Sequence, residues 1–477
     1  SYLWDDSQSI KKDFYKPLGR KKKKEKVDVN ETKGKGRKVA IVGAGPAGLT
    51  VAYYLALMGY KPTVFEALPI TGGMLRVGVP KYRLPDEILD YDIKMIEEVG
   101  VEIRTNTPIG PDLTLKDLKK AGYEAIFIAI GTHKSKRLGI DGEDLDGVFH
   151  ASGFLHDIGI GKKVDFKDKI VAVIGGGNVA IDVARSALRI GAEKVDIMCI
   201  ETREEMPAFK REIAEAEQEG IHIHTRRMPK RIIGVGGKVL GVETLECLSV
   251  FDAQGRFNPQ VKLDTEVIHE ADTIIVAVGQ EVDYTLLKAG DGILVTRKGL
   301  LRVDEITQMT NIPGVFAAGD AVSGPGLIID AIAKGYEAAI SIDRYLNGED
   351  LKKGRKKKEP IVAPFPKKEF DKQPRIKIPT LPVEERIRNF KEVELELTEE
   401  MAIKEAQRCL SCNICSLCKQ CVESCEAGAI NHDMEEKIVE LDVGAIVVAT
   451  GFDLFDPEKK PEYGYGKSKN VITGLEF

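Results

Sequence analysis

The chain has 477 residues, of which 43% are hydrophobic and 30% charged, a composition typical of folded globular proteins rather than disordered ones. Its apolar runs, such as 170–174 and 274–278, are far shorter than the roughly 20 residues of a membrane-spanning helix. The first residues also lack the basic-then-apolar pattern of a secretion signal. We therefore expect about three domains in a cytoplasmic protein without a membrane span.

The net charge of −5 is unevenly distributed along the chain. Residues 1–38 carry thirteen Lys and Arg against six Asp and Glu, and residues 351–378 carry eleven against three. We interpret the first stretch as a basic N-terminal extension, 1–38, and the second as a basic linker, 351–380. The densest basic runs, 20–24 and 355–358, contain no aromatic residue, so solvated segments are favoured over nucleic-acid binding.

The first strong motif follows a short apolar strand. It reads Gly43-x-Gly45-x-x-Gly48, continues into an apolar helix pattern, and is followed by a second strand that ends at Glu66. In such βαβ units the first glycine allows the tight turn, the second lets the backbone approach a pyrophosphate, and the third allows close helix packing. The N–H groups of the helix N-terminus face the phosphates, and Glu66 is placed to accept hydrogen bonds from ribose hydroxyls.

A second βαβ unit begins with the strand 169–174, and its second strand, 194–200, ends at Glu201. Here Ala180 takes the third small position. Two such units favour two occupied dinucleotide sites over an internal duplication that has lost one site. The turn and the first residues of its helix are Gly175, Gly176, Gly177, Asn178, Val179 and Ala180.

Two more strands end in small residues, at Gly131 and Gly279. A later segment ends in Gly319-Asp320 and precedes an apolar helix from Leu327. An Asp at the end of a buried strand can accept a hydrogen bond from a ribityl hydroxyl, and the following helix directs its positive end at a ligand. The alternative is an Asp that only caps a helix. The sequence 234–238 (GVGGK) lies between β-branched runs, which predicts a hairpin turn rather than a phosphate loop.

Three motifs recur in one order: 71–80 (TGGMLRVGVP), 203–208 (REEMPA) after the second unit, and 317–320 (AAGD). Together with the two βαβ units they resemble the glutamate synthase small subunit family of flavoproteins. The resemblance implies an α/β fold with two Rossmann-like, three-layer ββα domains of the glutathione-reductase type. It places FAD on the first unit, with candidate ligands Gly43, Gly45, Pro46, Ala47, Gly48, Glu66, Gly73, Leu75, Gly131, Gly319 and Asp320. It places a nicotinamide cofactor on the second unit, with candidate ligands Gly175, Gly177, Asn178, Val179, Ala180, Glu201, Arg203 and Gly279.

The chain departs from the family in two ways. NADPH-using members carry an Arg pair after the second strand of the cofactor domain, whereas this chain has Ile200 and Glu201 there. A carboxylate binds the ribose 2′-hydroxyl and repels a 2′-phosphate, so we predict NADH rather than NADPH, although Arg203 remains nearby. The family also has an Fe–S domain ahead of the flavin domain, whereas residues 1–38 contain no Cys.

Six of the eight cysteines lie within 409–425 and include the spacing Cys-x2-Cys-x2-Cys-x3-Cys of bacterial ferredoxins. This spacing favours one or two [4Fe–4S] clusters, whereas zinc sites usually pair two distant Cys-x2-Cys units. Glu426 stands where ferredoxins have Pro. The stretch resembles the C-terminal ferredoxin-like domains of glutamate-synthase-like subunits in anaerobic redox complexes. The candidate metal ligands are Cys409, Cys412, Cys415, Cys418, Cys421 and Cys425.

The tail, 436–477, resembles an internal piece of a heterodisulfide reductase subunit. Either the chain is truncated, or the tail docks on another part of the protein or on a partner, since a stretch this short cannot bury a core alone. The expected division of the chain is therefore an FAD domain (39–160 and 301–350), an NAD(H) domain (161–300), a small ferredoxin-like Fe–S segment (381–435) and this tail.

The motifs together predict a subunit that moves hydride between NADH and FAD and single electrons through [4Fe–4S] to a partner redox subunit of a larger complex, with a heterodisulfide-reductase-like protein as one candidate. The same path run backwards would reduce NAD⁺. No catalytic side chain is expected because the cofactors carry the chemistry. Two alternatives stay open: a glutamate synthase small subunit, and a non-catalytic Fe–S and flavin docking scaffold.

Overall fold

The computed structural model describes residues 36–110, 112–286, 292–355 and 373–409, and beyond them short stretches between 425 and 473. It divides into two compact units at Arg408/Cys409. The sequence predicts a boundary at 380/381 instead. The difference arises because residues 379–395 pack on the first unit, as described below. The described part of the second unit contains a single-turn 3-10 helix, η4 (Pro461–Tyr463).

The first domain is built on a five-stranded parallel sheet in the order β15-β4-β1-β2-β3. The central strand reads KVAIV and is buried after its first residue, as expected for a parallel strand covered on both faces. The strands are β1 (Lys38–Val42), β2 (Lys61–Phe65), β3 (Glu102–Arg104), β4 (Tyr123–Ile128) and β15 (Val315–Ala317).

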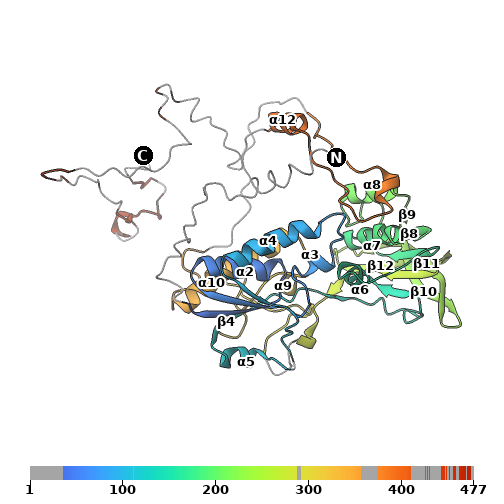
Figure 1. Ribbon diagram of the computed structural model, residues 1–477, viewed down its shortest axis with the longest axis horizontal. Coiled ribbons are helices and arrows are strands. Elements are labelled where there is room, and N and C mark those ends of the chain that lie inside the picture. The colour runs from blue at the N-terminus through green and yellow to red at the C-terminus, as the bar shows by residue number, and fades with distance from the viewer. Residues whose placement is uncertain are drawn as a thin grey trace. The chain divides into compact units, whose positions relative to one another are not determined.

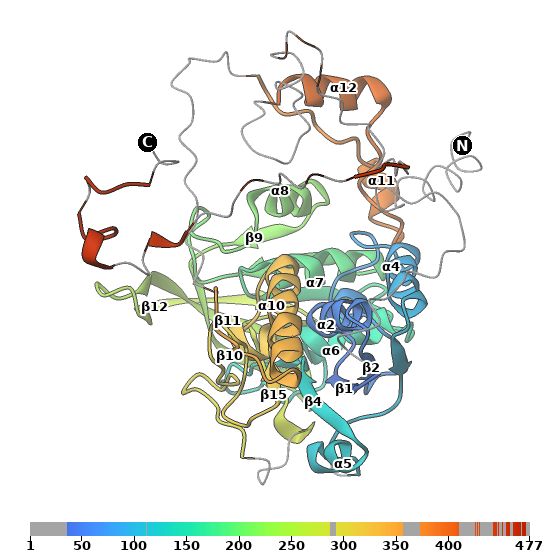
Figure 2. The same cartoon turned by 90° about the vertical axis from the view of Figure 1, so that its left-hand side faces the viewer.

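Helices cover both faces of this sheet. On one face α2 and α10 lie side by side, with α4 beside α2, over a core that includes Val39 and Ile41 (Figures 1 and 2). On the other face α5 packs on Ala40 and Val42. The helices of this domain are α2 (Pro46–Leu57), α3 (Met74–Val77), α4 (Asp86–Glu98), α5 (Leu115–Lys120), α9 (Asp320–Ser323) and α10 (Ile328–Leu346).

The second domain repeats this plan with a parallel sheet in the order β6-β13-β7-β8-β9. Helices α6, α7 and α8 cover the face that carries Val171 and Val173, and an antiparallel meander, β10-β11-β12, covers the face of Ala172 and Ile174. The sheet strands are β6 (Val148–His150), β7 (Ile170–Ile174), β8 (Lys194–Met198), β9 (His222–His224) and β13 (Thr273–Val276). The covering elements are α6 (Ala151–Gly159), α7 (Asn178–Arg189), α8 (Lys210–Gln218), β10 (Arg227–Val235), β11 (Lys238–Phe251) and β12 (Phe257–Glu270).

Two parallel-sheet Rossmann-like domains are thus confirmed. The turn between β10 and β11, where Val235 pairs with Lys238, confirms the predicted hairpin. Strand β6 belongs to the second sheet although it lies in the range 39–160 that we assigned to the first domain, because it pairs with β13. The two segments that connect the domains pair with each other through the short strands β5 (Lys134–Ser135) and β14 (Gln280–Glu281), and η1 (Tyr284–Leu286) follows.

After the first domain is completed by α10, the described chain resumes at residue 373 and forms two helices, α11 (Val383–Arg386) and α12 (Glu399–Gln407). Across the portion of the chain that the structure describes, every helix is too short or too polar to cross a lipid bilayer.

Candidate dinucleotide sites

The first candidate site is the turn from β1 to α2. Gly43 has φ of +104°, and a Cβ atom on it would lie 2.4 Å from the carbonyl oxygen of Ala129. A Cβ on Gly48 would lie 2.0 Å from the carbonyl oxygen of Gly43, so the helix sits directly against the turn. Pro46 is the first residue of α2, where its missing N–H costs no hydrogen bond. The turn therefore requires its glycines and leaves the amides of the helix N-terminus free for an anion.

Glu66 follows β2 and turns its carboxylate back to this loop. It accepts hydrogen bonds from the amides of Ala44, at 2.7 Å, and Leu68, at 2.9 Å, and only 6% of the residue is exposed. Burial raises the pKa of Glu66, and these backbone hydrogen bonds oppose the rise. The acid thus lies beside the turn, and its role toward a ribose stays a prediction.

Residues far away in the sequence converge on the start of α2. A Cβ on Gly73 would lie 2.8 Å from the Cα of Gly45, and a Cβ on Gly319 would lie 3.2 Å from the Cβ of Ala47. Leu75 packs against the core beneath. Gly131 comes two residues after Ala129, whose carbonyl oxygen lies where it would collide with a Cβ on Gly43. The structure therefore brings the predicted FAD residues into one region, while their roles as ligands stay predictions.

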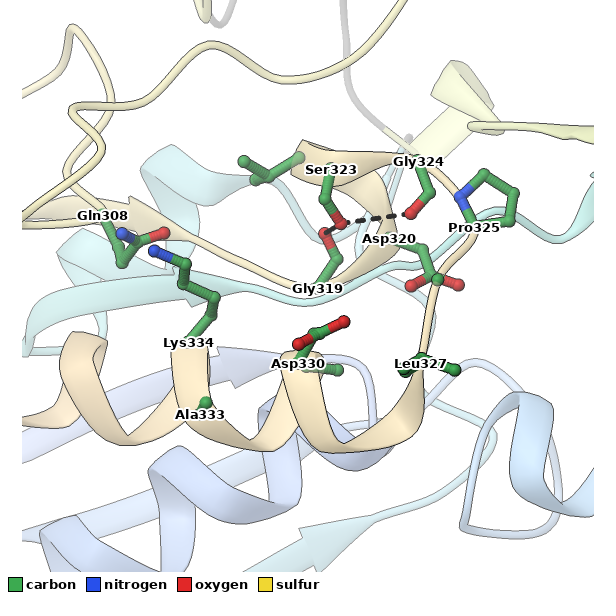
Figure 3. A pocket seen from close by; sticks show the side chains of 13 residues that line it. Gln308, Gly319, Asp320, Ser323, Gly324, Pro325, Leu327, Asp330, Ala333 and Lys334 are labelled. Carbon is green, nitrogen blue, oxygen red and sulfur yellow. Dashed lines mark hydrogen bonds between the residues drawn. The ribbon is translucent and has the colours of Figure 1, made fainter. Parts of the chain in front are cut away.

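A cavity of about 330 Å³ lies between α9 and the N-terminal end of α10 (Figure 3). Asp320 lines it beside Pro325 and Leu327, and Asp330 and Lys334 project from α10. Burial raises the pKa of Asp320 to about 6, although a backbone hydrogen bond from Gly326 opposes the shift. A half-buried carboxyl at a helix N-terminus suits a hydroxyl donor, which satisfies it without adding charge.

The second candidate site is the turn from β7 to α7. A Cβ on Gly175 would lie 2.4 Å from the carbonyl oxygen of Ala277, and a Cβ on Gly176 would lie 2.7 Å from Oε2 of Glu201. The Glu201 carboxylate therefore lies against the turn, and burial raises its pKa. Its Oε2 atom is buried, and within the described ranges no group donates a hydrogen bond to it. A buried oxygen without a donor is a place where a ligand hydroxyl fits.

The other predicted residues of this site surround the same turn. Arg203 pairs with Glu217 of α8, with 2.5 Å between Nη2 and Oε2, and its buried Nη1 atom finds no acceptor among the described residues. Asn178 begins α7, and its side-chain oxygen accepts the amide of Phe209 at 2.8 Å. Val179 and Ala180 continue the helix, and Ala180 is fully buried. Gly279 follows strand β13 and lies near the side chain of Lys136.

Both turns fit the dinucleotides that the sequence predicts. Each opens a helix, whose first amides lack intrahelical acceptors, and has an acid beside the turn; among the described residues no group donates to Oε2 of the second acid. Gly176 belongs to this turn as predicted from the sequence but is not among the candidate ligands, although its missing Cβ leaves the space that the Glu201 carboxylate occupies; its place as the middle glycine of the motif is the signal that could have identified it.

The predicted cluster ligands are only partly described. Cys409 is exposed, and Cys425 accepts the amide of Ala429 at 3.3 Å. Cys412, Cys415, Cys418 and Cys421 lie outside the described residues. In the described part of the chain no three His, Cys, Asp or Glu side chains group around a possible metal position. The Fe–S cluster therefore stays a prediction from the cysteine spacing.

Comparison with known proteins agrees with this geometry. Residues 37–335 match the family described as pyridine nucleotide-disulphide oxidoreductase. The beta subunit of the NADP(+)-dependent formate dehydrogenase of Moorella thermoacetica is 41% identical over 79% of this chain and 54% of that subunit, so the chain spans about half of its length. The glutamate synthase [NADPH] small chain of Escherichia coli is 34% identical over 67% of this chain and 71% of the relative. Mycobacterium tuberculosis FprA, solved in complex with NADPH, shares the fold with a TM-score of 0.57 at 19% identity, over 66% of this chain and 85% of FprA.

Proposed function

The chain belongs to the pyridine nucleotide-disulphide oxidoreductase family, among relatives of the glutamate synthase small chain, and on this basis we propose that it is the NADH- and FAD-dependent electron-transfer subunit of a larger redox complex. The observation that carries the proposal is the pair of glycine-rich turns, each with an acid beside it, in two domains of one compact unit. FAD, when bound, would accept a hydride from the nicotinamide and release electrons one at a time.

The protein's own residues bind and position these groups. Gly43, Gly45 and Gly48 would leave space for the pyrophosphate of FAD at α2, Glu66 would accept from its ribose, and Asp320 would accept from its ribityl chain. Burial raises the pKa of Asp320, and a hydroxyl that donates a hydrogen bond to its carboxylate would oppose this shift and favour the ionised form. No side chain is required to transfer a proton to or from the substrate in a hydride step.

NADH is the nicotinamide cofactor that the second site favours. Glu201 lies against the turn with an oxygen lacking a donor in the described chain, and nearby Arg203 pairs with Glu217 through Nη2 while its Nη1 has no acceptor among the described residues. A ribose hydroxyl would satisfy Glu201, whereas a 2′-phosphate would meet its negative charge. The names of both relatives carry NADP(+) or NADPH, which makes NADPH the alternative that the experiment below decides.

The cysteine spacing supports one or two [4Fe–4S] clusters that would take electrons from the flavin. The two relatives are a beta subunit and a small chain, which supports a partner redox subunit for this chain as well. The resemblance of 436–477 to part of a heterodisulfide reductase suggests a partner of that type.

Anaerobic mixing of the FAD- and iron-reconstituted protein with NADH or NADPH tests the proposal. We expect NADH to bleach the flavin absorbance within the turnover time, with partial bleaching of the broad iron–sulfur absorbance afterwards. Fewer than about three irons per chain would contradict the cluster. A protein whose flavin neither nucleotide bleaches is a docking scaffold and not an electron-transfer subunit.

A second candidate function is favoured by the 34% identity to the glutamate synthase small chain. In that case the natural complex would contain a large subunit that carries out amido transfer, and NADPH would be the preferred donor. Isolation of the native complex and identification of its other subunits distinguishes the two functions.

A further inference from the structure

The two domains are joined by a cluster of charged side chains, buried except for Arg83, that the cofactor sites do not use. Arg83, which follows α3 in the first domain, reaches Asp182 of α7 at 2.8 Å and Glu212 of α8 at 2.5 Å. Its neighbour Tyr82 is 1% exposed, and its ring centroid lies 4.0 Å from the guanidinium carbon of Arg189. The loop from the first domain is thus held by the helices of the second through ion pairs and a cation–π contact.

A third part of the chain covers this cluster. Residues 379–395, which we name the strap, fold back on themselves: the Leu381 amide donates to Val393, at 3.0 Å, and the Leu395 amide donates to Pro379, at 2.8 Å. The Val393 amide also donates to the carbonyl of Tyr82 at 3.0 Å, and Val393 itself is buried. The strap is therefore bound through its backbone to the loop of the first domain.

The strap also reaches the second domain through Arg386, the last residue of α11, which is 2% exposed. Its Nε lies 3.0 Å from Oε1 of Glu219 as an ion pair without a hydrogen bond, and its Nη2 donates to the side-chain oxygen of Gln218 at 3.2 Å. Glu219 already receives Arg185 at 2.7 Å and Arg189 at 2.8 Å, so three guanidinium groups meet one fully buried carboxylate. Removing Arg386 would take away the ion pair between the strap and the buried Glu219 carboxylate, on the side that the strap covers.

We propose that the strap, anchored by Val393 on Tyr82 and by Arg386 on Glu219, fixes the orientation of the nucleotide-binding domain relative to the FAD domain, and that Arg386 is a positioning residue for hydride transfer. The proposal rests on the proposed function for its kinetic part. Hydride transfer requires the reacting atoms to be about 3–3.5 Å apart. A small rotation at the domain junction would therefore slow transfer without removing any group that contacts the nucleotide.

The kinetic test uses the full chain loaded with FAD. Arg386→Ala should lower the limiting rate constant of flavin reduction at saturating NADH at least tenfold, while the Kd for NADH changes less than twofold. Arg386→Lys, which restores one positive charge near Glu219, should recover part of the rate. The matched control is Arg388→Ala, because Arg388 lies on the same segment and is exposed. A rate constant per bound FAD that is unchanged in Arg386→Ala would overturn the positioning role.

Hydrogen exchange tests the strap without any cofactor chemistry. In Arg386→Ala, amides in 80–85 and 379–395 should exchange at least tenfold faster than in the parent, with amides of β1 and β7 unchanged. Unchanged exchange in 80–85 would overturn the proposal, as would faster exchange throughout the chain, which would indicate general destabilisation. If the parent protein is reduced by neither NADH nor NADPH, the proposed function fails, whereas the exchange data still decide whether the strap joins the domains.

Discussion

The NADH preference that we propose depends on one side chain, Glu201, and substitutions there should reverse it. In Glu201→Gln the shape is kept and the charge is removed. In the double variant Ile200→Arg with Glu201→Arg, two guanidinium groups are offered to a phosphate, which they bind with paired hydrogen bonds. Glu204→Gln, three residues away and exposed, is the matched control.

The expected size of the effect follows from the charges. The 2′-phosphate of NADPH carries about −2 at neutral pH. Like charges a few ångströms apart in a partly desolvated cleft cost about 2–4 kcal/mol. This corresponds to a preference of roughly 30- to 1,000-fold for NADH in kcat/KM. Because Gly176 has no Cβ, the Glu201 carboxylate can lie against the turn.

The assay measures kcat/KM for both nucleotides by flavin reduction, from pH 5 to pH 9. Because burial raises the pKa of Glu201, its carboxylate is neutralised at a higher pH than an exposed glutamate, and the discrimination should weaken as pH falls through that pKa. Glu201→Gln should remove this pH dependence, and the double variant should favour NADPH. Equal use of both nucleotides by the parent, with no change in Glu201→Gln, would refute the placement of Glu201 at the ribose.

Three further outcomes are expected. Cys418→Ala should leave flavin reduction by NADH intact and lower electron delivery to a one-electron acceptor at least tenfold; loss of flavin reduction in the folded variant would reverse the order of the cofactors. FAD affinity, measured by fluorescence titration of the apoprotein, should be constant above pH 6 and fall up to tenfold per pH unit below it, because burial raises the pKa of Asp320 to about 6 and protonation removes the charge that makes its carboxylate a strong acceptor; Asp320→Asn should abolish this slope. Gly43→Ala should lose most bound FAD, whereas Gly100→Ala, at a similar φ of +102° but in open space, should retain it, as the absorbance ratio at 450 and 280 nm reports.

The sequence was sufficient for the parts of the fold that short segments encode. Glycine spacing, an apolar strand before it and a helix pattern after it fall within about 30 residues, so both dinucleotide units could be predicted. The same holds for the hairpin at 234–238, where β-branched runs flank two glycines. For these segments, local conformational preference and tertiary packing favour the same structure.

The charged junction could not be predicted in this way. Arg185 and Arg189 are charged residues of α7, and an amphipathic helix pattern places such residues on the solvent side. They are buried because Tyr82, about a hundred positions earlier, and Arg386, about two hundred positions later, cover them. Nothing within the helix itself indicates this cover, since it depends on which distant segments the fold brings together.

The two acids beside the two turns differ in a way that bears on how the cofactors are held. Glu66 directly follows β2, and backbone amides already satisfy its oxygens at 2.7 and 2.9 Å. In the second unit the residue that directly follows β8 is Cys199, and Glu201 reaches the turn from two residues further on, with a buried oxygen that no described group satisfies. An unsatisfied buried acceptor costs about 1–3 kcal/mol, and a ribose hydroxyl removes that cost on binding. The first turn is therefore complete before its ligand arrives, as suits a resident cofactor. The second is completed by its ligand, as suits a nucleotide that must bind and leave in every cycle.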